Sequence, residues 1–227
     1  MTGPSPDCTT AIVLIGGGTI DATSVGSLPK DCLVVAADSG VHVAEQLGLD
    51  VHVVIGDMDS IDATALAALA ALGTNVVRFP TDKNESDTEL ALRHAVGLGA
   101  RHLIIVGGGG GRLDHQLASF SVMFLEVLRG VRVESRIAGS RAFAVLDDKP
   151  ATIVCTPGDV IGLIPFGGDV HGVVTRGLQW ALAGESLQVA ASRGISNRAE
   201  GSEISVAVGA GRLIVTVDPT EPGEHST

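Results

Sequence analysis

Short runs of β-branched and other apolar residues recur through the first part of the chain, and several of them end in glycine or aspartate. The runs are Ala11–Ile15, Leu33–Ala37, Val53–Ile55, Asn75–Phe79, Leu103–Val106 and Val131–Ile137. Continuous apolar runs of this length are typical of strands that are buried on both faces. Because segments with helical features separate them, the pattern predicts an α/β fold: a mainly parallel sheet flanked by helices. Ligands of such sheets gather at the carboxyl ends of the strands.

The expected helices follow from the segments between these strands. They are Val41–Leu47 with Gly48 as its C-cap, Ala63–Leu72, a helix that ends near Leu98, and a helix that begins near Leu113 and continues to Leu128.

The sequence changes character near residue 140. Short strands separated by Gly, Pro, Asp and Asn follow, at Phe143–Leu146, Thr152–Cys155, Val160–Pro165, Gly172–Val174, Ser186–Val189, Glu203–Val208 and Leu213–Val217. This spacing predicts an all-β sandwich. We therefore expect two domains, residues 1–140 and 141–227, with a frayed tail from Asp218.

Composition excludes several classes of function. The net charge of −11 over 227 residues argues against a nucleic-acid partner, which requires a basic face. No apolar run approaches the roughly 20 residues of a membrane span. The first ten residues lack the features of a signal peptide, so we expect a cytoplasmic protein. The three cysteines, Cys8, Cys32 and Cys155, are far apart, which indicates isolated thiols and not a disulfide framework.

Asp57 and Asp59 follow the strand at Val53–Ile55 directly. If the chain stays extended, both carboxylates point to the same side of it. Hard oxygen ligands without nearby Cys or His favour Mg²⁺ over zinc. The alternative is that Asp59, Ser60 or Asp62 merely caps the next helix, and the sequence leaves this open.

A charged segment precedes the helix that ends near Leu98. Ser86 and Glu89 have the spacing of a capping box. That ordinary role leaves Lys83, Glu85 and Asp87 unexplained. A lysine beside carboxylates at a helix N-terminus is suited to a metal–phosphate site.

Two glycine-rich loops also follow strands. Gly16–Gly18 lacks the third glycine of the dinucleotide-binding fingerprint. Gly107–Gly111 is followed by Arg112 but by no Lys-Ser/Thr pair, so it is not a Walker A loop. The backbone of such a loop can approach a ligand closely, and Arg112 can contact phosphate through two N–H groups. A flexible turn with an exposed arginine is the alternative.

Trp180 is the only tryptophan. Burial in the sandwich core is the more common role for such a residue. An exposed aromatic face on an acidic protein would instead suit a flat cation.

Four blocks, taken together and in order, resemble thiamine pyrophosphokinase, and two further segments resemble that family's thiamine-binding domain. The blocks are Ala37–Gly40, Ile55–Ser60, Lys83–Ala91 and Gly110–His115, and the further segments are Gly177–Leu182 and Ser196–Asn197. The resemblance covers residues 11 to 217.

The resemblance implies a reaction and a site. Residues 1–140 would be a catalytic domain that binds ATP and Mg²⁺, and residues 141–227 would bind thiamine. The hydroxyl of thiamine would attack the β-phosphorus of ATP, giving thiamine diphosphate and AMP in a homodimer whose active sites lie between subunits. The implied catalytic residues are Asp57, Asp59, Lys83, Asp87, Arg112 and Asp114, of which Asp57, Asp59 and Asp87 would hold the metal. The implied nucleotide-binding residues are Asp38, Gly40, Thr88, Gly110, Gly111 and His115, and the thiamine contacts are Trp180, Ser196 and Asn197.

The chain departs from the family pattern at Val51-His52, Met58, Asn84 and Ser119, and in the residues after Asn197. His52 stands where the family commonly has Asp, and we expect its effect at the periphery of the metal site. Two other functions stay open from the sequence. One is a non-catalytic regulator that binds nucleotide or thiamine, and the other is a diphosphotransferase or hydrolase with a different substrate.

Overall fold

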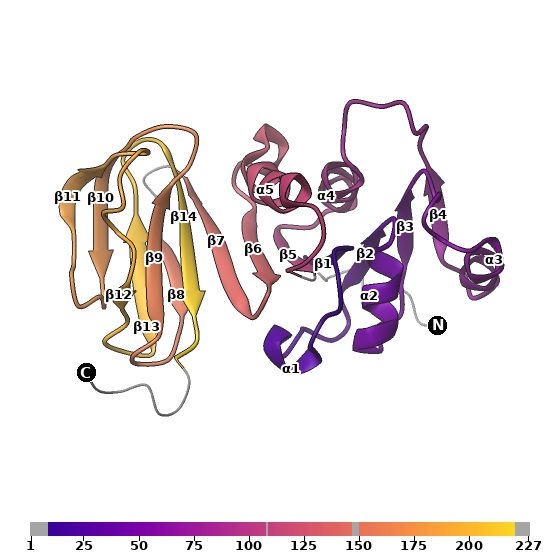
Figure 1. Cartoon of the computed structure of the whole chain (residues 1–227), viewed down its shortest axis with the longest axis horizontal. Helices are drawn as coiled ribbons and strands as arrows, with labels where there is room; N and C mark the ends of the chain where they lie inside the picture. Colours follow the sequence, from indigo (N-terminus) through magenta and orange to yellow (C-terminus); the bar gives the residue numbers. More distant parts are fainter. Residues whose placement is uncertain (1–8, 108, 147–149, 221–227) are drawn as a thin grey trace. The chain divides into compact units, whose positions relative to one another are not determined.

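The computed structural model describes residues 9–107, 109–146 and 150–220, and the chain divides into two units between Ala138 and Gly139 (Figure 1). Unit 1 is residues 1–138 and unit 2 is residues 139–227. Cys8 and most of the tail that was expected to fray lie outside the described residues.

Unit 1 contains a parallel sheet. Its strands are β1 (Thr10–Ile15), β2 (Leu33–Ala37), β3 (Val53–Gly56), β4 (Asn75–Arg78), β5 (His102–Gly107) and β6 (Arg132–Ile137). They lie in the order β6-β5-β1-β2-β3-β4, and every adjacent pair is parallel. All carboxyl ends therefore meet at one edge of the sheet. This arrangement confirms the predicted α/β fold.

Helices cover both faces of this sheet (Figure 1). They are α1 (Ala22–Val25), α2 (Gly40–Leu47), α3 (Ala63–Ala71), α4 (Asp87–Gly97) and α5 (Leu113–Ser121). Helix α4 packs on β1, β2 and β3. On the opposite face, Val41, Val43 and Ala44 of α2 join a buried cluster with Ile12 and Leu14 of β1.

Helix caps resolve one of the alternatives that the sequence left open. The side chain of Asp62 accepts hydrogen bonds from Thr64 N and Ala65 N at the start of α3. Asp62 is thus the cap of this helix, and Asp57 and Asp59 are not needed for that role. Ser86 caps α4 by accepting from Glu89 N, and Gly48 ends α2 in a left-handed conformation.

The helix expected from Leu113 to Leu128 is shorter than predicted. Helix α5 ends at Ser121, and two 3₁₀ turns follow, η1 (Val122–Phe124) and η2 (Glu126–Leu128). The hydroxyl groups of Ser119 and Ser121 bond back to the carbonyls of Gln116 and Leu117. Such bonds compete with the regular helix pattern, and Leu125 then adopts an extended conformation.

Unit 2 is a sandwich of two antiparallel layers. The strands of one layer have the order β12-β9-β14-β7, and those of the other have the order β11-β10-β13-β8. The strands are β7 (Ser140–Leu146), β8 (Ala151–Val154), β9 (Val160–Pro165), β10 (Val170–Arg176), β11 (Ala183–Leu187), β12 (Asn197–Arg198), β13 (Glu203–Ala207) and β14 (Arg212–Asp218). Their inward side chains form one buried hydrophobic cluster, as the predicted sandwich requires.

No helix in the described part of the chain is long and apolar enough to cross a membrane.

Candidate active site

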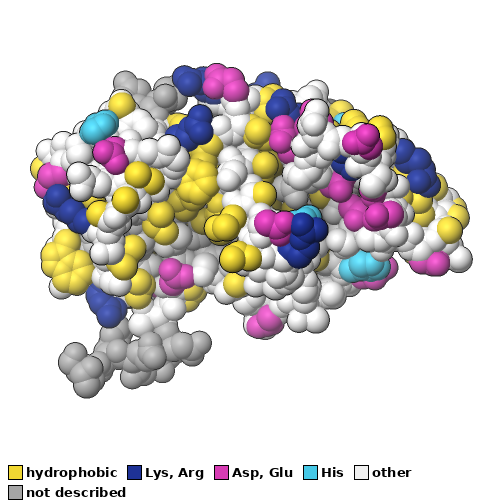
Figure 2. All heavy atoms as spheres, turned by 45° about the horizontal axis from the view of Figure 1, so that its top comes forward, with side chains coloured by type: hydrophobic (Ala, Val, Ile, Leu, Met, Phe, Trp, Pro, Cys, Tyr) yellow, Lys and Arg dark blue, Asp and Glu magenta, His cyan; other side chains and the backbone are white. Residues whose placement is uncertain are grey.

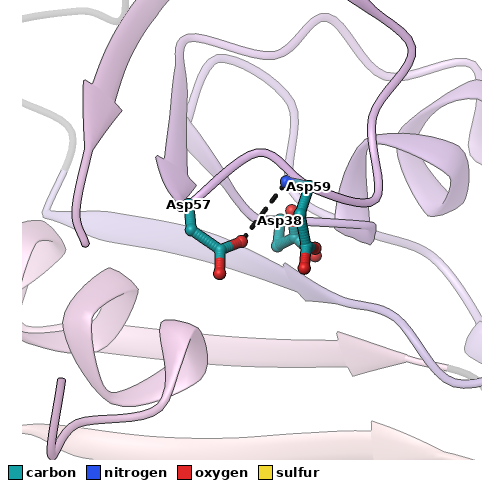
Figure 3. Close-up of side chains that lie close together, drawn as sticks. All are labelled: Asp38, Asp57 and Asp59. Carbon is teal, nitrogen blue, oxygen red and sulfur yellow. Dashed lines mark hydrogen bonds between the residues drawn. The ribbon is translucent and has the colours of Figure 1, made fainter. Parts of the chain in front are cut away.

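Three carboxylates converge at the carboxyl edge of the unit 1 sheet. Asp38 follows β2, and Asp57 and Asp59 follow β3. One oxygen from each lies within 4.8 Å of the others, and Figure 3 shows the three side chains turned toward a common point. These aspartates are called the acidic group below.

The backbone around Gly56 makes this convergence possible. Gly56 has a φ of +152°, and a Cβ atom there would lie 3.0 Å from Asp38 Cβ and 3.2 Å from Asp87 Oδ1. The Asp38 N–H donates to the Ile55 carbonyl over 2.8 Å, which holds the β2 loop against β3. Ser60 donates its hydroxyl to Asp38 Oδ2. The close approach of these loops therefore requires glycine at position 56.

The acidic group is electrostatically unbalanced. Asp57 accepts a hydrogen bond from Asp59 N, and this bond is the main reason that the pKa of Asp57 is lowered (Figure 3). The charge on Asp57 in turn raises the pKa of Asp59. Asp38 Oδ1 is buried and has no hydrogen-bond partner among the described residues. Converging hard oxygens and an unpartnered buried carboxylate oxygen fit a divalent cation such as Mg²⁺.

Lys83 connects Asp87 to the acidic group. Lys83 Nζ lies 3.1 Å from Asp87 Oδ1 and 4.0 Å from Asp57 Oδ2, and its side chain is only 12% exposed. Burial raises the pKa of Asp87, and the nearby ammonium group offsets part of this effect. The assembled group therefore differs from the predicted metal set in one member: Asp38 joins Asp57 and Asp59, whereas Asp87 pairs with Lys83.

A cavity of about 540 Å³ opens beside these residues. It is lined by side chains and loops that follow β1, β2, β4 and β5, including eight of the predicted residues: Asp38, Lys83, Asp87, Thr88, Gly110, Arg112, Asp114 and His115. In unit 1, acidic side chains gather on the face drawn at the right of Figure 2, with Lys and Arg side chains among them. The cavity is large enough for a small organic ligand.

The two glycine loops form one wall of this cavity. Gly16, Gly17 and Gly110 line it, and Gly110 N donates to the Gly17 carbonyl over 2.8 Å. A Cβ atom on Gly18 would lie 3.4 Å from the Cα atom of Gly110. The wall is thus made of main chain, which can present N–H groups to an anion.

Arg112 and Asp114 form an exposed ion pair at the mouth of the cavity. Arg112 donates from Nε to Asp114 Oδ1 over 3.1 Å and from a terminal nitrogen to Oδ2 over 2.5 Å. The hydrogen bonds from Arg112 are the main reason that the pKa of Asp114 is lowered. His115 follows at the start of α5 and lines the same cavity. In this arrangement Asp114 orients the guanidinium group.

Two predicted nucleotide-binding residues do not line the cavity. Gly40 is buried at the start of α2, where a Cβ atom would lie 2.2 Å from the Leu14 carbonyl oxygen, so it allows α2 to pack on β1. Gly111 lies beside the cavity and has a φ of +87°. A Cβ atom added to Gly111 would lie 3.6 Å from the Cα atom of Gly17.

His52 lies at the opposite edge of the sheet from the acidic group, which corrects the expectation that it affects the periphery of the metal site. It precedes β3, whereas Asp57 follows it. His52 Nδ1 accepts the Val34 N–H over 3.1 Å. Its role is therefore to complete the hydrogen bonding of β2 at the amino ends of the strands.

The predicted thiamine contacts lie in unit 2. Trp180 is 57% exposed, so it is not a core residue. It lines a second cavity of about 260 Å³ together with Asn197. Asn197 is buried, accepts from Trp180 N over 3.1 Å and donates to the Trp180 carbonyl over 2.8 Å. Ser196 is exposed, with a φ of +59°, and is not among the residues that line this cavity.

Sequence reasoning missed several supporting residues. Thr81 hydrogen-bonds to Asp57 through its side chain, Ser60 bonds to Asp38, and Gln116 bonds to the Gly109 carbonyl. Ser60 lies within a recognised block, so its position was a usable signal. Thr81 and Gln116 have no such signal, because they stand outside the recognised blocks Lys83–Ala91 and Gly110–His115.

Comparisons with known proteins find the same family in both units. A family model described as "Thiamin pyrophosphokinase, catalytic domain" matches residues 27–134, and one described as "Thiamin pyrophosphokinase, vitamin B1 binding domain" matches residues 150–213. Thiamine pyrophosphokinase 1 of Arabidopsis thaliana is 26% identical over 172 residues, which are 68% of this chain and 60% of the plant protein.

Solved structures share the fold. A thiamine pyrophosphokinase from Bacillus subtilis has a TM-score of 0.78 and 22% identity, with 92% of this chain and 98% of that chain covered. A thiamin pyrophosphokinase from Candida albicans has a TM-score of 0.72 and 15% identity, with 93% and 90% covered.

Proposed function

The chain belongs to the thiamin pyrophosphokinase family, and from this premise we propose that it transfers the diphosphate group of ATP to the hydroxyl of thiamine. In this reaction a bond forms between the hydroxyl oxygen and the β-phosphorus. The bond from the β-phosphorus to the oxygen bridging the α-phosphorus breaks, AMP leaves, and the hydroxyl proton is released. The observation that carries the proposal is the acidic group beside a large cavity at the carboxyl edge of the sheet.

We assign Mg²⁺ to the acidic group, with Asp57 and Asp59 as its central ligands and Asp38 beside them. Bound there, Mg²⁺ would neutralise charge on the phosphate oxygens of ATP. The donor set supports this assignment because it consists of hard oxygens whose mutual repulsion is visible in the raised pKa of Asp59. Asp87 forms an ion pair with Lys83, and this pair places the ammonium group of Lys83 next to Asp57.

The triphosphate of ATP fits the cavity of unit 1. Lys83 and Arg112 supply positive charge on its lining, and the glycine wall supplies main-chain N–H groups. Thr88 stands in the first turn of α4, where an anion can approach the backbone N–H groups, and His115 lines the same cavity at the start of α5. Phosphoryl-type transfer requires alignment and charge neutralisation more than covalent chemistry. These residues offer both.

We assign thiamine to unit 2, where Trp180 presents an exposed ring and the matching family model is that of a vitamin B1 binding domain. The thiazolium ring is flat and positively charged, which suits an aromatic face. We further propose a homodimer whose active sites lie between subunits, and sedimentation of the purified protein would test it. A cytoplasmic location stays a prediction.

The decisive experiment measures AMP formation from ATP and thiamine with Mg²⁺. We expect turnover by the wild type and its loss in Asp57→Asn. Asp62→Asn is the matched control, because Asp62 lies five residues away and serves only as a helix cap, a role that Asn fills equally well. Turnover that persists in Asp57→Asn contradicts the assigned site.

The same assay separates the other functions. A non-catalytic regulator would bind ATP or thiamine without forming AMP, and Asp57→Asn would leave that binding mostly intact. A hydrolase would form AMP without thiamine, and an enzyme for another acceptor would show up in a substrate panel at fixed ATP.

A further inference from the structure

The cavity of unit 2 has an apolar interior. Its floor is formed by buried residues, Leu163, Leu182 and Leu187, which are 1%, 9% and 0% exposed. Two of its walls are exposed apolar side chains, Trp180 and Ile195. On the face of unit 2 drawn at the left of Figure 2, hydrophobic side chains reach the surface. A volume of about 260 Å³ suits a small ring system.

Two charged side chains, Glu185 and Arg193, complete the lining of this cavity. Glu185 Oε2 accepts the Ala183 N–H, which fixes the carboxylate in place. This bond is the main reason that the pKa of Glu185 is lowered, so the group is ionised at neutral pH. The other oxygen, Oε1, lies 3.8 Å from a terminal nitrogen of Arg193, which is too long for a hydrogen bond.

The loop that carries Arg193 is anchored through its main chain. Leu163 N donates to the Gly194 carbonyl over 2.8 Å. Gly194 has a φ of +105°, and a Cβ atom there would lie 2.6 Å from the Leu163 carbonyl oxygen. The backbone position is therefore fixed while the side chain of Arg193 is 59% exposed and loosely paired. A loosely paired, solvated arginine is displaced at little cost.

Trp180 is held equally firmly. Both polar atoms of the buried Asn197 side chain bond to the backbone of Trp180. The indole ring thus projects from a fixed backbone beside a fixed carboxylate. A rigid aromatic face with an adjacent anion attracts a cation more strongly than it attracts a neutral ring of the same shape.

We propose that Glu185 determines specificity in this cavity: it selects flat cationic rings over neutral rings, and Arg193 is the counter-ion that such a ring displaces. For thiamine, this inference rests on the proposed function. It adds a residue outside the segments that resemble the family, and it assigns opposite effects to two neighbouring charges.

The single tryptophan makes a direct binding assay possible. Because Trp180 is the only tryptophan and lies on the cavity wall, its fluorescence reports on this cavity. The probes are thiamine and its neutral analogue in which a thiophene ring replaces the thiazolium. We expect Glu185→Gln, which keeps an acceptor for Ala183 N–H, to weaken thiamine binding about two- to fivefold and to leave the neutral analogue unchanged. Arg193→Met should tighten thiamine binding by a similar factor.

Several outcomes overturn the inference. It is wrong if Glu185→Gln weakens both probes equally, or neither, while the melting temperature stays that of the wild type. If the wild type makes AMP from ATP and thiamine in that case, the proposed function stands and only the role of Glu185 fails. If thiamine neither quenches fluorescence nor supports AMP formation, the proposed function fails. The pair 1-methylquinolinium and quinoline then tests the charge selectivity of the cavity independently.

Discussion

Replacing Gly56 by alanine tests whether the acidic group depends on the close approach of two loops over β3. The added methyl group would lie 3.0 Å from Asp38 Cβ and 3.2 Å from Asp87 Oδ1, so both carboxylates must move outward. We expect two effects, a loss of stability and a weaker metal site.

The magnitude follows from two terms. A side chain at a φ of +152° is strained, which costs about 1–3 kcal/mol. Crowding by one methyl group in a packed site costs about 1–3 kcal/mol more. The free energy of unfolding should therefore fall by about 2–6 kcal/mol, compared with a total of about 5–15 kcal/mol for a typical domain. Displaced carboxylates should weaken Mg²⁺ or Mn²⁺ binding by about tenfold or more.

Gly48→Ala is the matched control. Gly48 also has a positive φ, +63°, but nothing lies within 4 Å of an added Cβ atom. It should cost only about 1–2 kcal/mol and leave the metal affinity unchanged. Urea unfolding and calorimetric titration with Mn²⁺ measure both quantities. If Gly56→Ala matches Gly48→Ala in both measurements, the close approach does not support the site.

Three further predictions concern other parts of unit 1. Burial lowers the pKa of His52, so protonation favours the unfolded chain, and stability should be full above the ordinary histidine pKa of about 6.5 and fall as the pH drops below it. His52→Gln, which keeps an acceptor for Val34 N, should flatten the profile of unfolding free energy between pH 7 and 5, and an unchanged slope would count against this role. Lys83→Met should weaken calorimetrically measured ATP binding by about tenfold, because it removes a largely buried cation from the cavity lining; equal affinity would show that Lys83 serves only Asp87. Arg112→Lys should lower kcat/KM about tenfold in the AMP assay, since an ammonium group cannot make the two hydrogen bonds to Asp114 that orient the guanidinium group. An unaffected kcat/KM would mean that the positive charge alone suffices.

Local patterns predicted much of the fold. The strand at Leu33–Ala37 has the predicted bounds, and Gly48 ends α2 as expected, because runs of apolar residues and a helix-ending glycine act through nearby residues. Elements with weak local signals were missed. Helix α1 is a single short turn, and β12 is two residues long and forms only by pairing with β9. The formation of β12 therefore depends on a tertiary contact, whereas α1 is a single turn capped locally by Asp21.

The candidate site was predictable to the same extent. Asp57 and Asp59 both follow β3 and are close in sequence, but an extended chain is not what brings them together: Met58 between them has a φ of +66°, so they converge through a turn that the sequence did not reveal. Asp38 follows a different strand, β2, and its entry into the acidic group depends on the register of β2 with β3, which the sequence does not contain. The position of His52 at the far edge follows from strand direction, but its bond to Val34 N is a contact between strands.

Substitutions at the two ends of the short strand β3 should have different effects. From His52 to Asp57 the chain advances five residue steps, or about 16 Å at 3.3 Å per residue. Substitutions at the amino ends of the strands therefore change how firmly the sheet holds together, whereas those at the opposite rim change what the protein does. A search for thermostable variants of this protein should begin at the amino ends of the strands, where substitutions can raise stability without touching the candidate site.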